Sequence, residues 1–411
     1  LVTCPTFSPI SLQCYDLLPQ ATSLTELEFE ALGNGNGIIG NNPCGVIQIT
    51  ASNSAYLGCN TQVTRTYTIT EYLDANDNGI RDAGENTILN VVTCSQIFTI
   101  NDSTDPTITT QAANLEVQCD GSGNTAQLNA WLASNGGAVA SDVCSNVTWT
   151  NNFASVSDTC GATGSATVTF TATDACGNSS TTSATFTIID DTDPTITTQA
   201  ANLEVQCDGA GNTAQLNAWL ASNGGAVASD VCSNVTWSNN FASVSDTCGA
   251  TGSATVTFTT TDACGNTSTT SATFTIIDDT DPTITTQAAN LEVQCDGSGN
   301  TAQLNAWLAS NGGAVASDVC SNVTWTNNFA SVSDTCGATG SASVIFTATD
   351  ACGNSSTTSA TFTIIDDTDP TITTQASNLE VQCDGAGNTA QLNAWLASNG
   401  GAVASDVCSN V

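Results

Sequence analysis

One segment carries the residue types and spacing of a calcium-binding loop. Residues 74–85 read DANDNGIRDAGE. In a twelve-residue loop, oxygen donors at alternate positions surround Ca²⁺, a glycine makes the turn at position 6, and position 7 offers its backbone carbonyl. The predicted ligands are Asp74, Asn76, Asn78, Ile80, Asp82 and Glu85, with Gly79 at the turn. The flanking residues alternate as strands do, so we expect a structural ion between two strands. A solvated polar turn is the alternative interpretation.

A second group of carboxylates recurs along the chain. Its copies are Asp190, Asp191 and Asp193, then Asp278, Asp279 and Asp281, then Asp366, Asp367 and Asp369. Clustered carboxylates attract divalent cations. An ion shared here would stiffen a joint between modules, and a solvated turn before proline is the alternative. The corresponding residues near the start, Asn101, Asp102 and Asp105, are less acidic.

The composition argues against catalysis and against nucleic-acid binding. The chain has 38 acidic residues, two basic residues and no His, for a net charge of −36. Such a polyanion does not neutralise phosphates. Carboxylates are then the main groups left for acid–base chemistry, and here they recur in the turns of near-identical copies. We therefore expect no enzyme, no nucleic-acid partner and, without a long apolar run, no membrane span.

The sequence repeats with a period of 88 residues. We call residues 105–192, 193–280 and 281–368 repeats 1, 2 and 3, residues 369–411 the partial repeat, and residues 1–104 the N-terminal segment. A fixed long period indicates an array of similar modules. We expect each of these stretches to be a module or part of one. Because the chain has no Met and stops within a repeat, we also expect it to be a piece of a longer protein.

Periodicity predicts an all-β module with one short helix. In repeat 1, Leu128, Trp131 and Leu132 fall at helical spacing, so we expect a helix over 124–137 with Asn124 as its cap and Trp131 in the core. Residues 167–173 alternate strictly, which places Val168 on the buried face. The expected strands are 107–110, 115–118, 138–141, 147–153, 166–173 and 181–189. Short strands separated by turn signals favour tandem immunoglobulin-like β-sandwiches in a linear rod.

Nineteen cysteines predict disulfide bonds and an oxidising, extracellular setting. Zinc is disfavoured because there is no His and no CxxC pair. Cys160 and Cys176 flank a strand of roughly eight residues, and such a strand is more than about 25 Å long. A disulfide does not bridge this distance. We therefore predict bonds within a module, although a hairpin at 161–164 would allow neighbours to pair. The predicted pairs are Cys119–Cys160 and Cys144–Cys176, with their copies Cys207–Cys248, Cys232–Cys264, Cys295–Cys336 and Cys320–Cys352.

Several motifs resemble a hyalin-repeat (HYR)-like module. They are LEVQC at 115–119, SDVC at 141–144, TDACGN at 173–178, ATFTI at 184–188 and DDTDP at 190–194. Such modules recur in long secreted surface proteins of Bacteroidota, including gliding-type adhesins. The calcium loop is similar to loops in the B repeats of Sdr-type adhesins. The resemblance implies export to the cell surface. In the N-terminal segment it implies the pairs Cys4–Cys94 and Cys14–Cys59, and it leaves the partner of Cys44 open.

The sequence predicts a structural role on the outside of a cell. The join at 188–196 is short and contains Pro194, unlike a flexible linker. We expect a disulfide-stapled, calcium-stiffened stalk of a surface adhesin, with neighbouring modules of the same chain as partners. The alternative is a self-assembling filament or sheath made of many copies. Carbohydrate binding through an exposed Trp149 is a third, weaker hypothesis.

Overall fold

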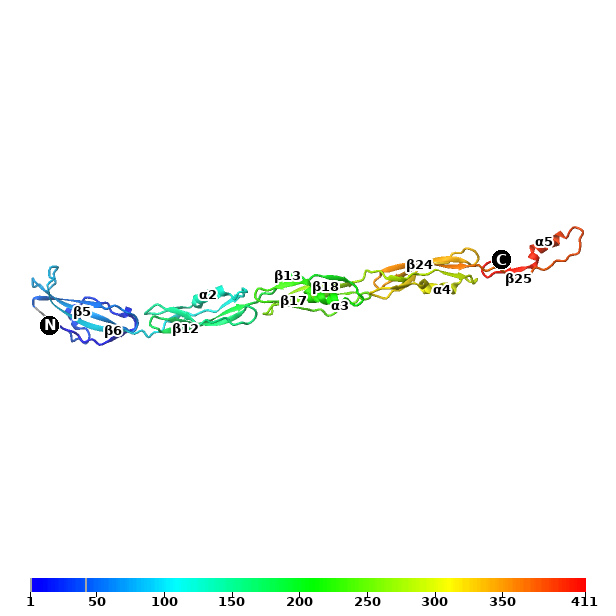
Figure 1. Ribbon diagram of the computed structural model, residues 1–411. Helices are drawn as coiled ribbons and strands as arrows, with labels where there is room; N and C mark the ends of the chain where they lie inside the picture. The colour runs from blue at the N-terminus through cyan, green and yellow to red at the C-terminus, as the bar shows by residue number, and fades with distance from the viewer. Residues whose placement is uncertain (1, 41–42) are drawn as a thin grey trace. The chain divides into compact units, whose positions relative to one another are not determined.

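The computed structural model describes residues 2–40 and 43–411 (Figure 1). The chain forms two compact units. The first contains the chain up to Asp193 together with two loops of repeat 2, residues 230–234 and 262–266. The second contains the remainder of repeat 2, repeat 3 and the partial repeat. The boundary between the units therefore does not coincide with the boundary between two repeats.

Repeat 1 is a four-stranded sheet with a short helix and a separate strand pair. Its elements are β7 (Thr107–Thr110), β8 (Leu115–Gln118), α2 (Thr125–Ala133), the 3-10 turn η2 (Asn135–Gly137), β9 (Val139–Ser141), β10 (Thr148–Asn151), β11 (Gly164–Thr173) and β12 (Ser179–Ile189). The sheet order is β10-β11-β12-β8, with β8 parallel to β12 and the other pairs antiparallel. Strands β7 and β9 pair with each other. These bounds confirm the mostly β module with one short helix.

The core of repeat 1 follows the predicted alternation. Val168 and Phe170 are fully buried, whereas the alternating threonines Thr167 and Thr169 lie on the other face. Trp131 packs edge-on against Phe170 with ring centroids 5.3 Å apart, and its indole N–H donates to the carbonyl of Ala113 at 3.0 Å. A buried Trp with a satisfied N–H is a packing anchor.

Asn124 occupies the predicted N-cap position of α2, but its side chain does not cap the helix. Asn124 has a left-handed backbone (φ 49°) and makes no cap hydrogen bond. Its side chain instead donates to the carbonyl of Gln118 at 2.7 Å and accepts the N–H of Asp120 at 3.2 Å. The residue is fully buried. Asn124 therefore ties the loop after β8 to the start of α2, because asparagine tolerates this conformation better than most residues.

The other repeats have the same elements in the same order. In repeat 2 they are β13 (Thr195–Thr198), β14 (Leu203–Gln206), α3 (Thr213–Ala221), η3 (Asn223–Gly225), β15 (Val227–Ser229), β16 (Thr236–Asn239), β17 (Gly252–Thr261) and β18 (Thr267–Ile277). In repeat 3 they are β19 (Thr283–Thr286), β20 (Leu291–Gln294), α4 (Thr301–Ala309), η4 (Asn311–Gly313), β21 (Val315–Ser317), β22 (Thr324–Asn327), β23 (Gly340–Thr349) and β24 (Ser355–Ile365). The partial repeat has β25 (Thr371–Thr374), α5 (Thr389–Ala397), η5 (Asn399–Gly401) and β26 (Val403–Ser405).

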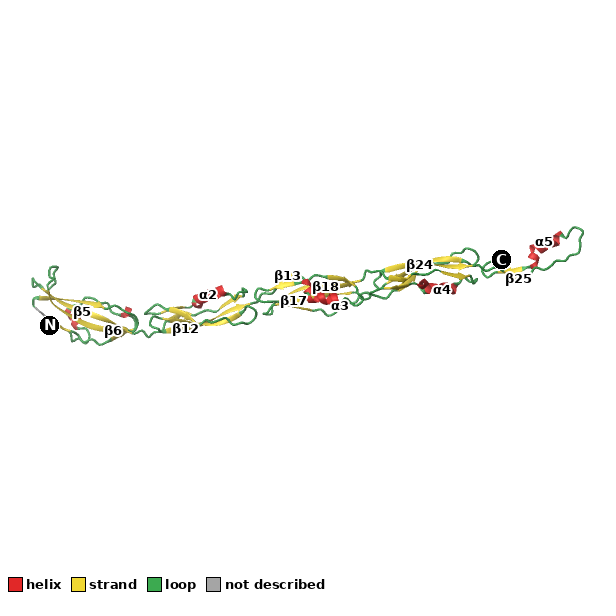
Figure 2. Ribbon diagram, viewed as in Figure 1, coloured by secondary structure: helices red, strands yellow, loops and turns green. Residues whose placement is uncertain are grey.

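The N-terminal segment builds a related sheet with longer strands. Its elements are β1 (Val2–Thr3), β2 (Ile10–Leu12), η1 (Tyr15–Leu17), α1 (Glu26–Glu30), β3 (Ile38–Ile39), β4 (Gly45–Asn53), β5 (Thr61–Leu73) and β6 (Ile88–Ile100). The order β2-β6-β5-β4, with β2 parallel to β6, matches the order in the repeats. Strands are the main element throughout, and the helices are short (Figure 2).

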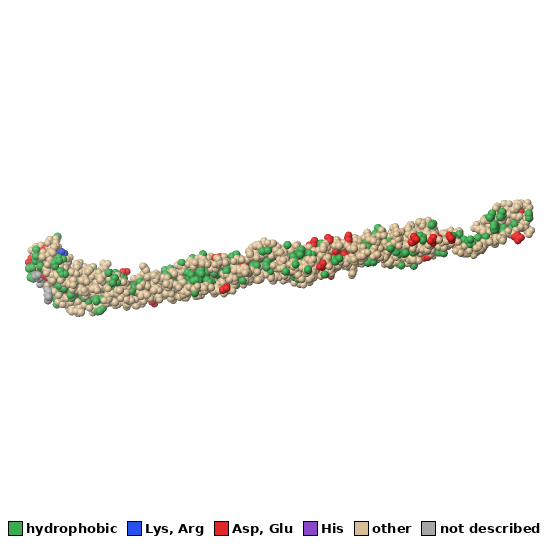
Figure 3. Space-filling model, viewed as in Figure 1, with side chains coloured by type: hydrophobic (Ala, Val, Ile, Leu, Met, Phe, Trp, Pro, Cys, Tyr) green, Lys and Arg blue, Asp and Glu red, His purple; other side chains and the backbone are tan. Residues whose placement is uncertain are grey.

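The visible surface is mostly uncharged. In Figure 3 most atoms are backbone or uncharged polar side chains, with small groups of acidic and hydrophobic side chains between them. Within the described ranges, no helix has the length and hydropathy needed to cross a membrane.

Candidate functional site at the junctions between repeats

The strand register places the four cysteines of repeat 1 at two opposite ends of its sheet. Val117 pairs with Ile188, and Ile188 pairs with Gly164, so Cys119 and Cys160 lie near the same end. Thr148 pairs with Thr173, which puts Cys144 and Cys176 near the other end. The two members of each predicted pair thus lie at the same end of the sheet.

The disulfides nevertheless join different repeats. Cys119 bonds to Cys232 and Cys160 bonds to Cys264, with Cα atoms 6.0 and 5.2 Å apart. The predicted pairs Cys119–Cys160 and Cys144–Cys176 are therefore wrong, because loops 230–234 and 262–266 of the next repeat reach these cysteines. The copies Cys207–Cys248, Cys232–Cys264, Cys295–Cys336 and Cys320–Cys352 are wrong for the same reason. The structure instead has Cys207–Cys320, Cys248–Cys352 and Cys295–Cys408.

The N-terminal segment is joined to repeat 1 in the same way. The predicted bond Cys4–Cys94 is confirmed. The predicted bond Cys14–Cys59 is wrong, since Cys14 bonds to Cys144 and Cys59 bonds to Cys176. Cys336 and Cys383 are exposed and lie outside the eight disulfides, and they are the copies of Cys160 and Cys119.

Backbone contacts seat the loop that carries Cys232. The N–H of Ala162 donates to the carbonyl of Cys232 at 2.9 Å. Gly121 and Gly161 have positive φ, and an added Cβ would lie 2.5 Å from the carbonyl oxygen of Val231 and 2.6 Å from that of Cys232. Sequence reasoning missed these two glycines, although a glycine recurs at both positions in every full repeat. A glycine that recurs in a loop indicates a place where another backbone approaches closely.

A second contact seats the loop that carries Cys264. The side-chain amide of Asn266 donates to the carbonyl of Asp190 at 3.1 Å, and it also donates to the carboxylate of Asp262 at 2.8 Å. The Asn266 side chain thus connects the end of repeat 1 with a loop of repeat 2. Asn178 makes the equivalent bond to the carbonyl of Asp102 at 3.2 Å.

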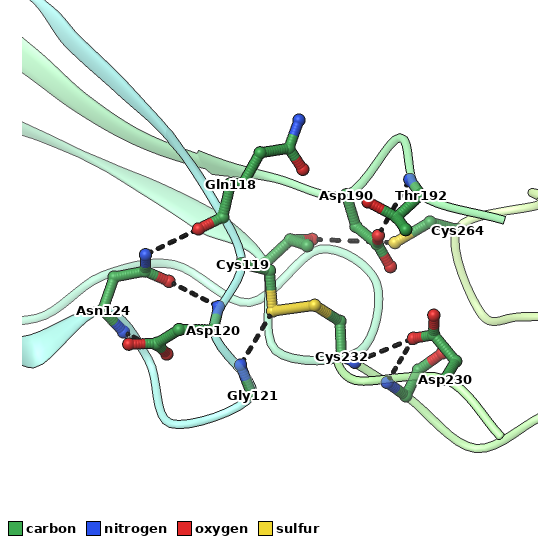
Figure 4. Close-up of a disulfide and its surroundings, with 12 residues drawn as sticks. Gln118, Cys119, Asp120, Gly121, Asn124, Asp190, Thr192, Asp230, Cys232 and Cys264 are labelled. Carbon is green, nitrogen blue, oxygen red and sulfur yellow. Dashed lines mark hydrogen bonds between the residues drawn. A yellow bond between two sulfur atoms is a disulfide. The ribbon is translucent and has the colours of Figure 1, made fainter. Parts of the chain in front are cut away.

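The junction also brings two carboxylates together beside the Cys119–Cys232 bond (Figure 4). Ligand atoms of Asp190, Asp230 and Cys232 all lie within 4.8 Å of one another. Asp230 accepts the N–H groups of Cys232 at 2.8 Å and Ser233 at 3.0 Å. Oδ1 of Asp190 accepts the N–H of Thr192 at 3.3 Å, whereas Oδ2 is buried and has no hydrogen-bond partner.

The predicted run Asp190, Asp191 and Asp193 does not form this cluster. Asp230 from the following repeat joins Asp190, and sequence reasoning did not select it. Asp191 is exposed and accepts the side-chain amide of Gln118 at 2.5 Å. The cluster recurs as Asp102 with Asp142 and Cys144, Asp278 with Asp318 and Cys320, and Asp366 with Asp406 and Cys408.

The surroundings of Asp190 disfavour the ionised form of its carboxyl group. Burial raises the pKa of Asp190, and the like charges of Asp230, Asp262 and Asp191 raise it further, against the opposing hydrogen bond from Thr192. Burial also works to raise the pKa of Asp262, but hydrogen bonds from Asn266 and neighbouring N–H groups outweigh it and lower that pKa. The three repeats contain no Lys, Arg or His that would neutralise these charges.

The predicted calcium loop joins β5 to β6, and its predicted ligand residues are hydrogen-bonded within the loop. Asp74 and Glu85 are buried although both are acidic. Oδ2 of Asp74 accepts the N–H of Gly79 at 2.7 Å, and this bond is the main cause that lowers the pKa of Asp74. Glu85 accepts the N–H groups of Ala75 at 2.9 Å and Asp82 at 2.8 Å. The loop is thus closed by its first and last acidic residues.

The middle of the loop is polar and exposed, and its side chains bond to one another. The side-chain amides of Asn76 and Asn78 both donate to Oδ2 of Asp82, at 2.7 and 2.9 Å. The N–H of Ile80 donates to Oδ1 of Asn78 at 2.8 Å, and Gly79 has the positive φ that the turn requires. The donor set is of the hard-oxygen type that Ca²⁺ prefers.

Comparisons with known proteins leave the family open. No protein-family model matches the chain, and no curated protein matches it. Among solved structures, the chain is similar to the protocadherin GammaB4 extracellular domain, with 12% identity and a TM-score of 0.29 over 92% of this chain and 69% of that one. It is also similar to Drosophila N-cadherin EC1-4, with 11% identity and a TM-score of 0.20 over 88% and 99%. These values do not place the chain in the cadherin family.

Proposed function

We propose that this chain is the structural stalk of a repetitive cell-surface adhesin, built from immunoglobulin-like modules that disulfides fasten to one another. The pairing of the cysteines carries the proposal. Among the residues that the structure describes, seven disulfides connect a repeat to the segment before or after it, and one, Cys4–Cys94, lies within a segment. Bonds of this number persist in oxidising compartments outside the cytoplasm. The hyalin-repeat character and a Bacteroidota surface protein are part of the proposal, and the sequence motifs alone support them.

Three covalent connections at one joint are what a stalk needs. Between repeats 1 and 2 they are the polypeptide after Ile189, the bond Cys119–Cys232 and the bond Cys160–Cys264. A joint held at one point turns freely about that point, whereas a joint held at three separate points does not. A stiff joint lets the number of repeats set the distance between an adhesive tip and its anchor.

Calcium in the loop of the N-terminal segment belongs to the same proposal. Asp74, Asn76, Asn78, Asp82 and Glu85 would supply side-chain oxygens, and Ile80 would supply its carbonyl. The ion would hold the long β5–β6 connection in one conformation. Calcium titration of Asp74→Asn beside the wild type tests this site, and an unchanged number of bound ions would contradict it.

The stalk is tested by removing both disulfides of one junction. The variant Cys119→Ser/Cys160→Ser/Cys232→Ser/Cys264→Ser and the wild type are compared by small-angle X-ray scattering at several concentrations. We expect a shorter maximum dimension and greater flexibility in the variant. The control is Cys336→Ser/Cys383→Ser, which removes two cysteines but no disulfide and keeps the wild-type profile. A quadruple variant indistinguishable from the wild type overturns the proposal.

A further inference from the structure

We propose that three junctions each bind a divalent cation, of the calcium class, between one carboxylate at the end of a segment and one carboxylate in a loop of the next. The sites are Asp102 with Asp142, Asp190 with Asp230, and Asp278 with Asp318. This proposal goes beyond the stalk function and stands if that function fails, since it rests on the chemistry of the junction. Its ligands differ from the predicted run, because Asp230 takes the place of Asp191 and Asp193 beside Asp190.

The first observation is a buried carboxylate oxygen without a partner. Asp102 is only 5% exposed, and its Oδ2 is buried and receives no hydrogen bond. Its Oδ1 accepts the N–H of Thr104 at 3.1 Å. A buried polar atom with no partner is rare in folded proteins and costly when it carries charge. Oδ2 of Asp190 and Oδ2 of Asp278 are buried and unpartnered in the same way.

The second observation is what faces that oxygen. A carboxylate oxygen of Asp142 lies within 4.8 Å of a carboxylate oxygen of Asp102. Oδ1 of Asp142 accepts the N–H groups of Cys144 at 2.8 Å and Ser145 at 2.9 Å. These two bonds fix Asp142 from its own loop. Two carboxylates at this separation repel each other unless a proton or a cation lies between them.

No basic side chain is available to act as that cation. The chain has two basic residues, Arg65 and Arg81, both in the N-terminal segment. Arg65 bonds to Asn53 and the carbonyl of Pro19, and Arg81 bonds to Gln48 and Asn86. Both guanidinium groups are therefore held elsewhere.

The chemistry of the donors favours a hard divalent ion. The two carboxylates offer oxygen, as calcium requires. The third member of each cluster is the sulfur of a disulfide, which lacks the thiolate form that binds soft metals. Because the two carboxylates come from different segments, the ion would bind only when the junction is assembled.

The test counts calcium ions on the full chain. Equilibrium dialysis against CaCl₂, followed by elemental analysis, is performed on the wild type and on Asp142→Asn/Asp230→Asn/Asp318→Asn. We expect the variant to bind three fewer ions, one for each substituted junction. The charge-matched control is Asp191→Asn/Asp279→Asn/Asp367→Asn, whose residues lie outside the clusters, and it keeps the wild-type number. Equal numbers in all three proteins overturn the proposal.

A second measurement guards against a variant that folds differently. Disulfide mapping must find Cys14–Cys144, Cys119–Cys232 and Cys207–Cys320 in the triple variant, as in the wild type. If these bonds are missing, the single variant Asp142→Asn replaces it, and the expected loss is one ion. A single variant with intact disulfides and no lost ion overturns the proposal, and it leaves the disulfide-fastened stalk untouched.

Discussion

At the scale of single residues, the junction depends on positions that have no side chain. Gly121 and Gly161 allow the carbonyl groups of Val231 and Cys232 to approach the preceding repeat, and this approach brings the cysteines within bonding distance. We therefore expect a side chain at either position to hinder the covalent link, although the glycines carry no chemistry themselves.

We predict that Gly121→Ala weakens the junction and Gly123→Ala does not. Both glycines have positive φ, 74° and 81°, so both substitutions introduce similar backbone strain. Only the alanine at 121 would meet another atom, the carbonyl oxygen of Val231, whereas nothing lies within 4 Å at 123. Overpacking of this kind costs roughly 1–3 kcal/mol. Refolding in a glutathione buffer with quantitative mapping of Cys119–Cys232 measures the effect, and equal yields for the two variants would contradict it.

We predict an acid-sensitive loop before α2. Hydrogen bonds from the N–H groups of Asn124 and Ser122, together with the Ser122 hydroxyl, lower the pKa of Asp120. A carboxylate with a lowered pKa stabilises the fold above its unfolded pKa, and this contribution disappears as the pH falls through the folded value. The stability difference between wild type and Asp120→Ala should therefore be largest near neutral pH and shrink towards pH 3. Thermal unfolding across this range measures it, with the exposed Asp158→Ala as the control.

At the scale of elements, each repeat is held together by its sheet and its helix. Trp131 on α2 contacts Phe170 on β11 and Phe186 on β12, with ring centroids 5.3 and 5.7 Å apart. The helix thus connects two strands through one side chain. Because no disulfide lies within a repeat, this packing carries the stability of the module.

Trp131→Ala is expected to unfold repeat 1 locally. Removing a buried Trp costs roughly 3–5 kcal/mol, and the identical helices of the other repeats do not compensate. Hydrogen exchange followed by mass spectrometry should show lost protection in β11 and β12 only. Trp149→Ala is the comparison, because that side chain is half-buried on β10 and should cost less. Equal loss of protection in both variants would show that α2 does not anchor the core.

The sequence was a good guide to elements and a poor one to the junction, for physical reasons. Period-2 and helical spacing are local, so β7, β8, α2 and β11 lie where the pattern predicts them. The bond from Cys119 goes to Cys232, which is a copy of Cys144. In a near-identical array the sequence does not show which repeat supplies a partner, and local spacing does not show that a copy of Cys144, and not of the predicted partner Cys160, reaches Cys119. The Asp190–Asp230 contact is hidden for the same reason.

At the scale of the whole molecule, reduction should separate two kinds of stability. All the disulfides except Cys4–Cys94 connect segments, whereas the buried cores lie within repeats. Reduction with a mild thiol is therefore expected to leave the circular dichroism of the β-sheets intact while scattering reports more flexible joints. Loss of β signal at the same reductant concentration would mean that the repeats need their neighbours in order to fold.

The cysteines of a junction should resist alkylation until they are reduced. Cys119 and Cys160 are bonded to Cys232 and Cys264. Treatment of the native protein with a maleimide, followed by peptide mapping, should leave Cys119 and Cys160 unlabelled, and both should be labelled after reduction. Labelling of either residue without reduction would contradict the pairing.

The overlap of the disulfides has a consequence for survival outside a cell. The bonds from Cys4–Cys94 to Cys295–Cys408 overlap in sequence, so every peptide bond between Cys4 and Cys408 is enclosed by at least one of them. A protease that cuts once in this stretch opens the backbone but releases no fragment. Even in the linker before Pro194, two bonds still bridge the cut. Nicked chains would migrate as one species on a gel until a reductant is added.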